Sequence, residues 1–204
     1  MKEILIATKN PGKAGEFAGL FHPFGVRVET LLDHPELPEV EETGATFQEN
    51  ARLKAETISR LLKKPVLADD SGLMIGALGG RPGVFSARYA GENKDDQKNI
   101  EKVLAEMAGI PAEKRNAEFV CILALAIPGE ETRFFKGTCS GIILTEKRGH
   151  GGFGYDPIFY VPEKGKTFAE MTGEEKNAIS HRGRAMENLE QWLRFTAGEG
   201  GLFR

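Results

Sequence analysis

The spacing of hydrophobic residues predicts the first elements of the fold. Residues 2–8 contain a short apolar run that is typical of a buried strand. Asn10 and Pro11 then provide an N-cap and a first helical residue, so we expect a helix to begin there. The apolar positions of this helix recur every three or four residues, at Ala14, Phe17, Ala18 and Phe21.

A second helix is predicted from Thr46 to about Lys64. Thr46 and Glu49 have the spacing of a capping box, in which each side chain accepts a hydrogen bond from the other residue's backbone amide. Pro65 ends the helix, and residues 66–68 form a brief strand that leads into an irregular, glycine-rich segment. The apolar positions of the helix are Phe47, Ala51, Ala55, Ile58 and Leu62.

The rest of the chain continues to alternate between strands and helices. A third helix is predicted near residues 96–108. Apolar stretches at 117–127 and 132–144 flank a Pro-Gly turn and predict a long hairpin at the centre of a sheet. After a second glycine-rich segment, a final helical region begins with a capping-box pattern at 172–175 and reaches about Phe195. This order predicts an α/β or α+β globule with two lobes around a groove.

Composition excludes several classes of protein. The chain has 204 residues, 40% hydrophobic and 28% charged, as in an ordinary soluble domain. Its formal net charge of -3 gives no overall attraction to nucleic acid or to an anionic membrane. The N-terminal apolar run is too short for a signal peptide, and no stretch of about 18 apolar residues is present. The two cysteines form neither a metal motif nor a disulfide framework, so we expect a reducing, cytoplasmic location.

The first candidate site surrounds the start of the first predicted helix. Lys9 and Lys13 place positive charge where the backbone amides and the helix macrodipole are already positive. This arrangement is explained if an anion such as a phosphate lies against Gly12 and the two ammonium groups. An ordinary solvated lysine pair explains the spacing alone slightly better, and the spacing of a P-loop is absent.

Acidic residues form the second candidate site. Asp69, Asp70 and Ser71 directly follow the predicted strand at 66–68. Neighbouring side chains of an extended backbone point in opposite directions, so we expect only one aspartate to face a given pocket. The alternative is an Asx turn that merely ends the strand. A second acidic run, which alone is typical of a solvated loop but together with Asp70 would suit Mg²⁺, comprises Glu36, Glu39, Glu41 and Glu42.

Two further sets of residues could carry chemistry. Lys54 lies four residues after Asn50 and seven after Phe47, along the edge of the apolar face of the second predicted helix. From this edge its ammonium group can point into a cleft, or the side chain can snorkel and keep the ammonium group in solvent. An aromatic ring between glycines can stack on a base, and Lys, His and Arg can donate hydrogen bonds to keto or phosphate oxygens. Taken singly, Phe153 is more typical of a core residue and His181 of a structural histidine. This last set consists of Phe153, Gly154, Tyr155, Asp156, Lys176, His181 and Arg182.

Together, the motifs resemble those of the inosine/xanthosine triphosphate pyrophosphatase family. Six of them occur in the family's order: ATKNPGK, EETGATFQENARLKA, LADDSGL, LGGRPGVFSARYAG, GGFGYDPIF and EKNAISHRGRA. The resemblance covers almost the whole chain. It implies one domain over residues 1–204, with an elongated central mixed sheet flanked by helices and a cleft between two lobes. It also implies a homodimer that uses Mg²⁺ to convert ITP, dITP and XTP to monophosphate and pyrophosphate, which cleanses the nucleotide pool.

The resemblance implies roles for residues at matching positions. The phosphate-binding loop is matched by Thr8, Lys9, Asn10, Pro11, Gly12 and Lys13, although many members have glycine where Lys9 stands. Lys54 matches a second phosphate lysine, and Asp70 matches the general base and a metal ligand, beside Ser71 in contact with substrate. Glu42 is the best match for the second metal ligand, with Glu39 and Glu41 as rivals. The base pocket is matched by Phe153, Gly154, Tyr155, Asp156, Lys176, His181 and Arg182.

The chemistry of the residues agrees with this resemblance. Hydrolysis at the α-phosphorus requires charge neutralisation on the triphosphate and an aligned water, which Lys13, Lys54, Mg²⁺ and Asp70 would supply. A nucleotide-binding module without catalysis would use the same lysines but release no pyrophosphate. A pyrophosphatase that acts on canonical nucleotides, or one that acts on modified pyrimidine nucleotides, is the nearest enzymatic alternative. RNA binding fits poorly, because basic and aromatic residues do not interleave along the chain.

Overall fold

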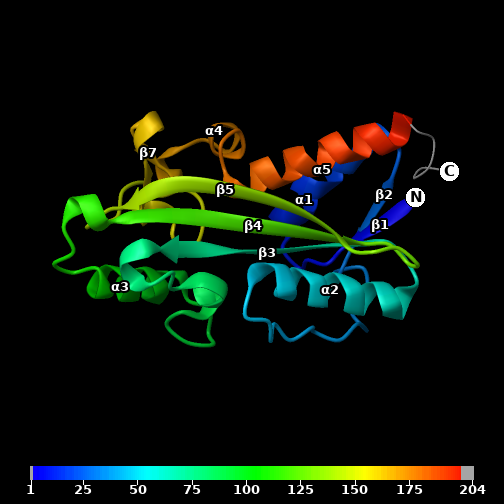
Figure 1. The fold of residues 1–204 in the computed structure, drawn as a ribbon, viewed down its shortest axis with the longest axis horizontal. Coiled ribbons are helices and arrows are strands. Elements are labelled where there is room, and N and C mark those ends of the chain that lie inside the picture. Colours follow the sequence, from blue (N-terminus) through cyan, green and yellow to red (C-terminus); the bar gives the residue numbers. More distant parts are fainter. Residues whose placement is uncertain (1, 199–204) are drawn as a thin grey trace. The chain divides into compact units, whose positions relative to one another are not determined.

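A mixed seven-stranded sheet is the central element of the computed structural model, which describes residues 2–198. The strands are β1 (Glu3–Ile6), β2 (Arg27–Thr30), β3 (Val66–Ile75), β4 (Asn116–Ala126), β5 (Arg133–Ile143), β6 (Phe159–Val161) and β7 (Lys166–Thr167). They lie in the order β2-β1-β3-β4-β5-β6-β7 (Figure 1). β1 pairs in parallel with β2 and β3, whereas β6 pairs antiparallel with β5 and β7.

Helices flank this sheet, and the fold divides into two compact units. The α-helices of the described residues are α1 (Pro11–Phe21), α2 (Phe47–Leu62), α3 (Asp96–Glu106), α4 (Gly173–Asn177) and α5 (His181–Gly198). None of them is long and apolar enough to cross a membrane. Unit 1 contains residues 2–70, 122–136 and 185–198, and unit 2 contains residues 71–121 and 137–184. A single domain over the whole chain and a cleft between lobes stay predictions.

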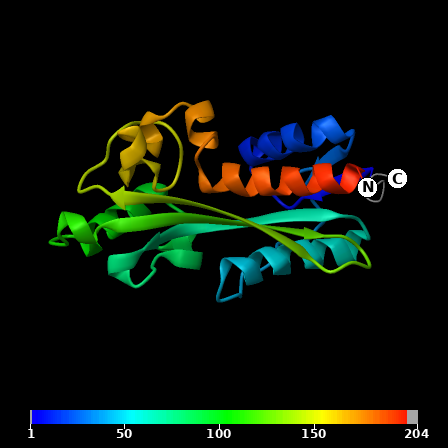
Figure 2. The same ribbon diagram turned by 45° about the horizontal axis from the view of Figure 1, so that its top comes forward.

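In unit 1, helices cover both faces of the parallel strands. α1 and α5 lie side by side on one face and α2 lies on the other, as the two views agree (Figures 1 and 2). Phe17 and Phe21 of α1 are fully buried, as are Ala51 and Ala55 of α2 and Leu189 of α5. The three- and four-residue periodicity therefore predicted these helices and their buried faces.

Aromatic residues fill much of the core of unit 2. The rings of Phe119, Phe159 and Phe168 lie with their centroids 4.6, 4.9 and 5.7 Å apart. His181, at the start of α5, stacks on Phe119 with a centroid distance of 4.7 Å and nearly parallel planes. Val103 of α3 belongs to the same buried cluster. Stacked and tilted aromatic pairs of this kind add to the stabilisation from burial alone.

The starts of α1 and α2 follow the predicted capping signals. Asn10 Oδ1 accepts a hydrogen bond from the Lys13 amide at 3.2 Å, which caps α1. The capping box of α2 is complete, and the Glu49 amide donates to Thr46 Oγ1 at 3.1 Å. α2 ends where Lys63 adopts a left-handed backbone conformation with φ 56°.

The predicted end of the third strand is wrong. β3 does not stop at Ala68 but continues to Ile75, so Asp69, Asp70 and Ser71 lie within a strand rather than in a turn after it. Asp and Ser side chains satisfy the backbone of a turn when no ladder is available, but here the strand continues beside its other neighbour, β4. The segment from Gly72 onward is therefore extended for four more residues instead of irregular.

The predicted final helix is in fact two helices. α4 ends at Asn177, and Ser180 then caps α5 by accepting a hydrogen bond from the Gly183 amide at 3.0 Å. The corner between the helices is tight, because a Cβ atom on Gly183 would lie 1.9 Å from the carbonyl oxygen of Asn177. The short strands β2, β6 and β7 were not predicted, since segments of four, three and two residues carry no readable periodicity.

Replacing Thr46 by alanine tests the capping box of α2. We expect the free energy of unfolding to fall by about 1 kcal/mol, because the Glu49 amide loses its acceptor. Urea denaturation measures this change, and its slope should stay constant. Gln48→Ala, at an exposed position of the same helix, is the matched control and should change stability by less than about 0.5 kcal/mol. Equal stability of Thr46→Ala and the wild type would contradict the prediction.

Candidate functional site

Two lysine–carboxylate contacts involve adjacent residues of β3 in unit 1. Lys13 Nζ lies 2.7 Å from Asp69 Oδ2. Lys54 Nζ lies 2.7 Å from Glu42 Oε1 and 3.5 Å from Asp70 Oδ1. Successive side chains of a strand point to opposite faces, and α1 and α2 cover opposite faces of this part of the sheet. Each aspartate therefore meets the lysine of a different helix, and Lys13 contacts Asp69 rather than Asp70.

The loop before α1 is held by its own side chains. Thr8 is buried, and its Oγ1 accepts a hydrogen bond from the Asn10 amide at 3.1 Å. Lys9 is exposed, and Pro11 and Gly12 form the first turn of α1. The Lys13 amide is already hydrogen-bonded to Asn10, so an anion at this helix start would depend more on the two ammonium groups than on that amide.

Lys54 is directed into the protein and does not snorkel into solvent. Its side chain is 17% exposed, and the ammonium group contacts two carboxylates. Burial alone disfavours the charged form, but the carboxylates of Asp70, Asp69 and Glu42 more than offset this effect and raise the pKa of Lys54. The ammonium group is therefore charged at neutral pH.

Asp70 is held in an environment that disfavours its ionised form. Burial raises the pKa of Asp70 to about 6, the charge of Lys54 opposes this shift, and the charge of Glu42 adds to it. Asp70 Oδ2 is buried and makes no hydrogen bond to any residue from 2 to 198. A buried carboxylate oxygen without a partner is costly unless a ligand occupies it, which makes this oxygen a candidate cation ligand.

The residues around Asp70 fit a hard divalent cation. Glu42 and Asp70 meet at the same ammonium group and present carboxylate oxygens, whereas Glu39 and Glu41 make no ion pair in the part of the chain that the structure describes. Within residues 2–198 no three His, Cys, Asp or Glu side chains form a complete metal centre. A cation here would need other oxygen ligands, as Mg²⁺ typically does when it binds through one or two carboxylates plus phosphates and water.

Two residues of this site were not assigned a role from the sequence. The alternation of side chains along a strand predicted no partner for Asp69. In the structure, Asp69 forms an ion pair with Lys13 of α1. Asn50 is fully buried one helical turn before Lys54, and its Oδ1 accepts a hydrogen bond from the Gly44 amide at 2.7 Å. The apolar stripe that surrounds Asn50 was the available signal, since a buried amide on such a stripe requires partners.

A second group of predicted residues comes together in unit 2. Phe153 is 53% exposed, with the Lys176 ammonium group 4.6 Å and the Arg182 guanidinium carbon 5.7 Å from its ring centroid. Asp156 Oδ2 accepts hydrogen bonds from Lys176 Nζ at 2.5 Å and from the Phe153 amide at 2.9 Å. Burial raises the pKa of Asp156, and the charge of Lys176 opposes that shift. A Cβ atom on Gly152 would lie 1.9 Å from Asp156 Oδ2, so only glycine permits this contact.

The other predicted residues of unit 2 support this group from within the core. Tyr155 is buried, and its hydroxyl donates to the Ser86 carbonyl oxygen at 2.8 Å. Burial raises the pKa of Tyr155. His181 is buried in its stack on Phe119, and the Gly154 amide donates to Asp96 Oδ2 at 2.7 Å. Tyr155 and His181 therefore have structural contacts of the kind expected for core residues.

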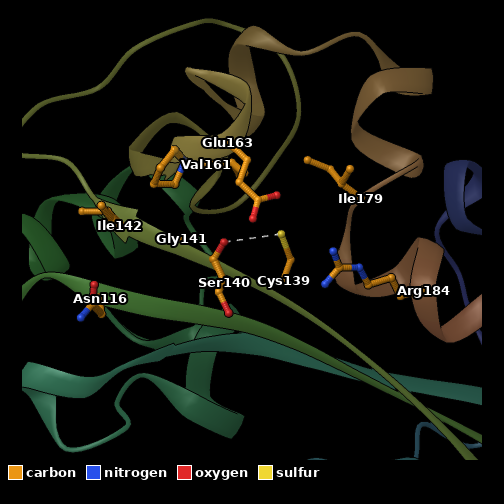
Figure 3. Close-up of a pocket in the computed structure, with 10 residues that line it drawn as sticks. Asn116, Cys139, Ser140, Gly141, Ile142, Val161, Glu163, Ile179 and Arg184 are labelled. Atoms are coloured by element: carbon orange, nitrogen blue, oxygen red, sulfur yellow. Dashed lines mark hydrogen bonds between the residues drawn. The ribbon is translucent and has the colours of Figure 1, made fainter.

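A separate pocket lies elsewhere in unit 2. It encloses about 360 Å³, and the side chains of Glu163, Cys139 and Arg184 point toward one another in it (Figure 3). The Cys139 thiol donates a weak hydrogen bond to the Ser140 carbonyl oxygen at 3.8 Å, and burial raises its pKa. None of the residues predicted to bind nucleotide or metal lines this pocket.

The paired lysines and carboxylates of unit 1 are groups that bind phosphates and metals, and the aromatic ring of unit 2 with cations over its face is of the kind that binds bases. The chain belongs to the Ham1 family, which it matches over residues 4–192. The predicted family resemblance and the α/β fold with a mixed sheet are thereby confirmed.

Named relatives and a solved structure place the chain within this family. A protein of Geobacillus kaustophilus named dITP/XTP pyrophosphatase is 61% identical over 201 residues, which are 98% of each chain. A Bacillus subtilis protein of the same name is 56% identical over 193 residues, covering 95% of this chain and 98% of the relative. The structure of the Staphylococcus aureus Ham1 protein has a TM-score of 0.90 and 48% identity, over 96% of this chain and all of that one.

The raised pKa of Asp70 predicts an effect of pH on stability. The folded protein favours protonated Asp70, so the stability linked to this group is present at low pH and is lost as pH rises toward the folded pKa of about 6. Asp70→Asn imitates the neutral form. In the presence of EDTA, we expect this variant to be more stable than the wild type at neutral pH by about 1–3 kcal/mol. Urea denaturation at a series of pH values measures the difference, which should close near about pH 4.

Asp33→Asn provides a control of opposite sign. Hydrogen bonds from the Thr30 amide and hydroxyl lower the pKa of Asp33, so its contribution is present above the ordinary pKa and is lost as pH falls. This variant should be less stable than the wild type at neutral pH. An Asp70→Asn variant that also loses stability at neutral pH would contradict the environment assigned to Asp70.

Proposed function

We propose that this protein hydrolyses dITP, XTP and ITP to the nucleoside monophosphate and pyrophosphate, with Mg²⁺ as the metal. Removing these non-standard purine nucleotides from the pool prevents their incorporation into DNA and RNA. The observation that carries the proposal is the buried cluster in which Lys54 contacts both Glu42 and Asp70. The names of the Geobacillus and Bacillus relatives supply the substrate class.

The residues of unit 1 carry the phosphate chemistry in this proposal. Asp70 and Glu42, rather than Glu39, hold Mg²⁺, which when bound neutralises charge on the triphosphate. Lys54 and Lys13 contribute fixed positive charge to the phosphate oxygens. Asp70 also accepts the proton of the attacking water as the general base.

The group around Phe153 in unit 2 carries base recognition in this proposal. Phe153 offers a ring face for stacking, and Lys176 and Arg182 donate hydrogen bonds to the 6-keto oxygen of the base. Adenine has an amino group at that position, so donor would face donor, and a polar mismatch of this kind can discriminate by roughly 10⁴-fold. Guanine shares the 6-keto oxygen, so these donors select against adenine and not against guanine.

A substrate panel tests the proposed reaction. Pyrophosphate release is measured from dITP, ITP, XTP, GTP and ATP, each with Mg²⁺ and with EDTA. We expect release from dITP, ITP and XTP, none from ATP, and none from any of the nucleotides in EDTA. Asp70→Asn should lose at least about 10²-fold in kcat, the range expected when a general base is removed, while nucleotide binding stays measurable. Nucleotide binding without pyrophosphate release by the wild type would instead indicate a non-catalytic binding module.

Alanine substitutions at Lys176 and Arg182 test the assignment of base recognition. Removing the donors should lower the ratio of kcat/KM for ITP to that for ATP by at least about tenfold, because each lost hydrogen bond to the keto oxygen costs on the order of 1–3 kcal/mol. Steady-state kinetics on both substrates provide the ratio. Glu174→Ala, on α4 with an exposed side chain, is the matched control and should leave the ratio unchanged. An unchanged preference in the double variant would refute the assignment.

We also propose that the protein forms a homodimer in the cytoplasm, as the family resemblance implies. Sedimentation velocity at micromolar concentration measures the assembly state directly. A monomer that remains fully active would exclude the dimer as a requirement for the reaction.

A further inference from the structure

We propose that Asn50 is a positioning residue that fixes the acidic loop (residues 36–45) so that Glu42 and Asp70 can share one divalent cation. This inference deepens the proposed function and rests on it. It assigns a role to a buried side chain that touches neither phosphate nor base in the proposal above.

The end of the acidic loop is tied to α2 by consecutive hydrogen bonds. The Gly44 amide donates to Asn50 Oδ1 at 2.7 Å. The next two amides, of Ala45 and Thr46, donate to Glu49 Oε2 at 2.7 and 3.2 Å. Three successive backbone groups therefore find their acceptors on one turn of the helix. This arrangement fixes where the loop approaches α2, two residues after Glu42.

Asn50 also faces the second proposed metal ligand. Because its Oδ1 accepts from Gly44, the orientation of the amide is set and Nδ2 is directed away from that amide. The Asn50 amide lies close enough to Asp70 to lower the pKa of that carboxyl. Asn50 Nδ2 and Asp70 Oδ2 are both buried, and neither makes a hydrogen bond to any residue from 2 to 198. The side chain that accepts a hydrogen bond from the loop of Glu42 thus also interacts with the carboxyl group of Asp70.

A metal site formed by two separate segments requires such a connection. Glu42 lies on a loop and Asp70 on a strand, and the described residues supply no third carboxylate to hold the pair together. Side chains that orient the ligands of a metal commonly change its affinity by about 10–100-fold when they are removed. Asn50 is suited to this role, since it is completely buried and has no freedom to follow a displaced loop.

Gly44 provides an independent probe of the same contact. A Cβ atom at this position would lie 2.7 Å from Asn50 Oδ1 and 2.7 Å from Glu49 Cβ, so a methyl group cannot be accommodated without moving the loop. Gly44→Ala therefore displaces the acidic loop from α2 without changing any charge or any donor of the site. Asn50→Leu removes the acceptor and the donor while it keeps a similar volume.

The experiment measures Mn²⁺ binding to the full chain without nucleotide, by electron paramagnetic resonance of the free ion. We expect the dissociation constant of Mn²⁺ to rise by about 10–100-fold in both Asn50→Leu and Gly44→Ala. In the turnover assay, the half-saturating Mg²⁺ concentration should rise in parallel, whereas kcat at saturating Mg²⁺ should change less. A role in folding alone would lower the melting temperature without changing either metal constant.

Two controls separate the positioning role from a loss of stability and from the general effect of replacing a glycine by alanine. Gly19→Ala adds a Cβ with no atom within 4 Å and should bind Mn²⁺ like the wild type. Ile58→Val destabilises the same helix in its core and should also leave Mn²⁺ binding unchanged. Wild-type Mn²⁺ affinity in either Asn50→Leu or Gly44→Ala overturns the inference. Absence of pyrophosphate release by the wild type overturns the proposed function instead, and the metal-binding result still decides the role of Asn50.

Discussion

A buried ammonium group shared by two carboxylates is the interaction on which the rest of the site depends. Lys54 contacts Glu42 and Asp70, and Lys13 pairs with Asp69 on the adjacent residue, so two cations face three carboxylates when all are ionised. With fewer cations than carboxylates, the negative charges of Glu42 and Asp69 add to the effect of burial and disfavour the ionised form of Asp70. A divalent cation bound here would reverse this balance and leave a net positive site, which would attract a triphosphate.

The fold creates this cluster by extending one strand beyond its parallel neighbour. β1 pairs with β3 only as far as Ile6 opposite Leu67, and β3 continues through Asp69 and Asp70. Beyond that pairing, the side chains of the two aspartates alternate toward α1 and α2, and each helix supplies one lysine. The exact starts of these helices matter, because the caps at Asn10 and Thr46 set the position of each lysine relative to the strand.

The sequence predicted those features that depend on local chemistry. Capping residues and apolar periodicity located α1, α2 and α3, since both signals act within a few residues. The extension of β3 through two aspartates could not be predicted, because β4, the strand beside it, is distant in the sequence. In the site, Lys54 was predicted as a candidate, with Glu42 as the best match for the acidic partner and Glu39 as a rival. The ion pair between Lys54 and Glu42 needed coordinates, as did the inward direction of Lys54.

Each unit contains a buried aspartate that contacts a lysine, and the two aspartates differ in how far their oxygens are hydrogen-bonded. Asp156 Oδ2 accepts from Lys176 and from the Phe153 amide, so its contacts orient the lysine over the aromatic ring. Asp70 has one oxygen near Lys54 and another without a partner among residues 2–198. A carboxylate whose oxygens are hydrogen-bonded holds its partner side chains in place. A buried carboxylate oxygen without a hydrogen bond lowers stability but can still bind a ligand. In the proposed reaction, Asp70 would therefore hold the metal and accept the proton, whereas Asp156 would orient the lysine that recognises the base.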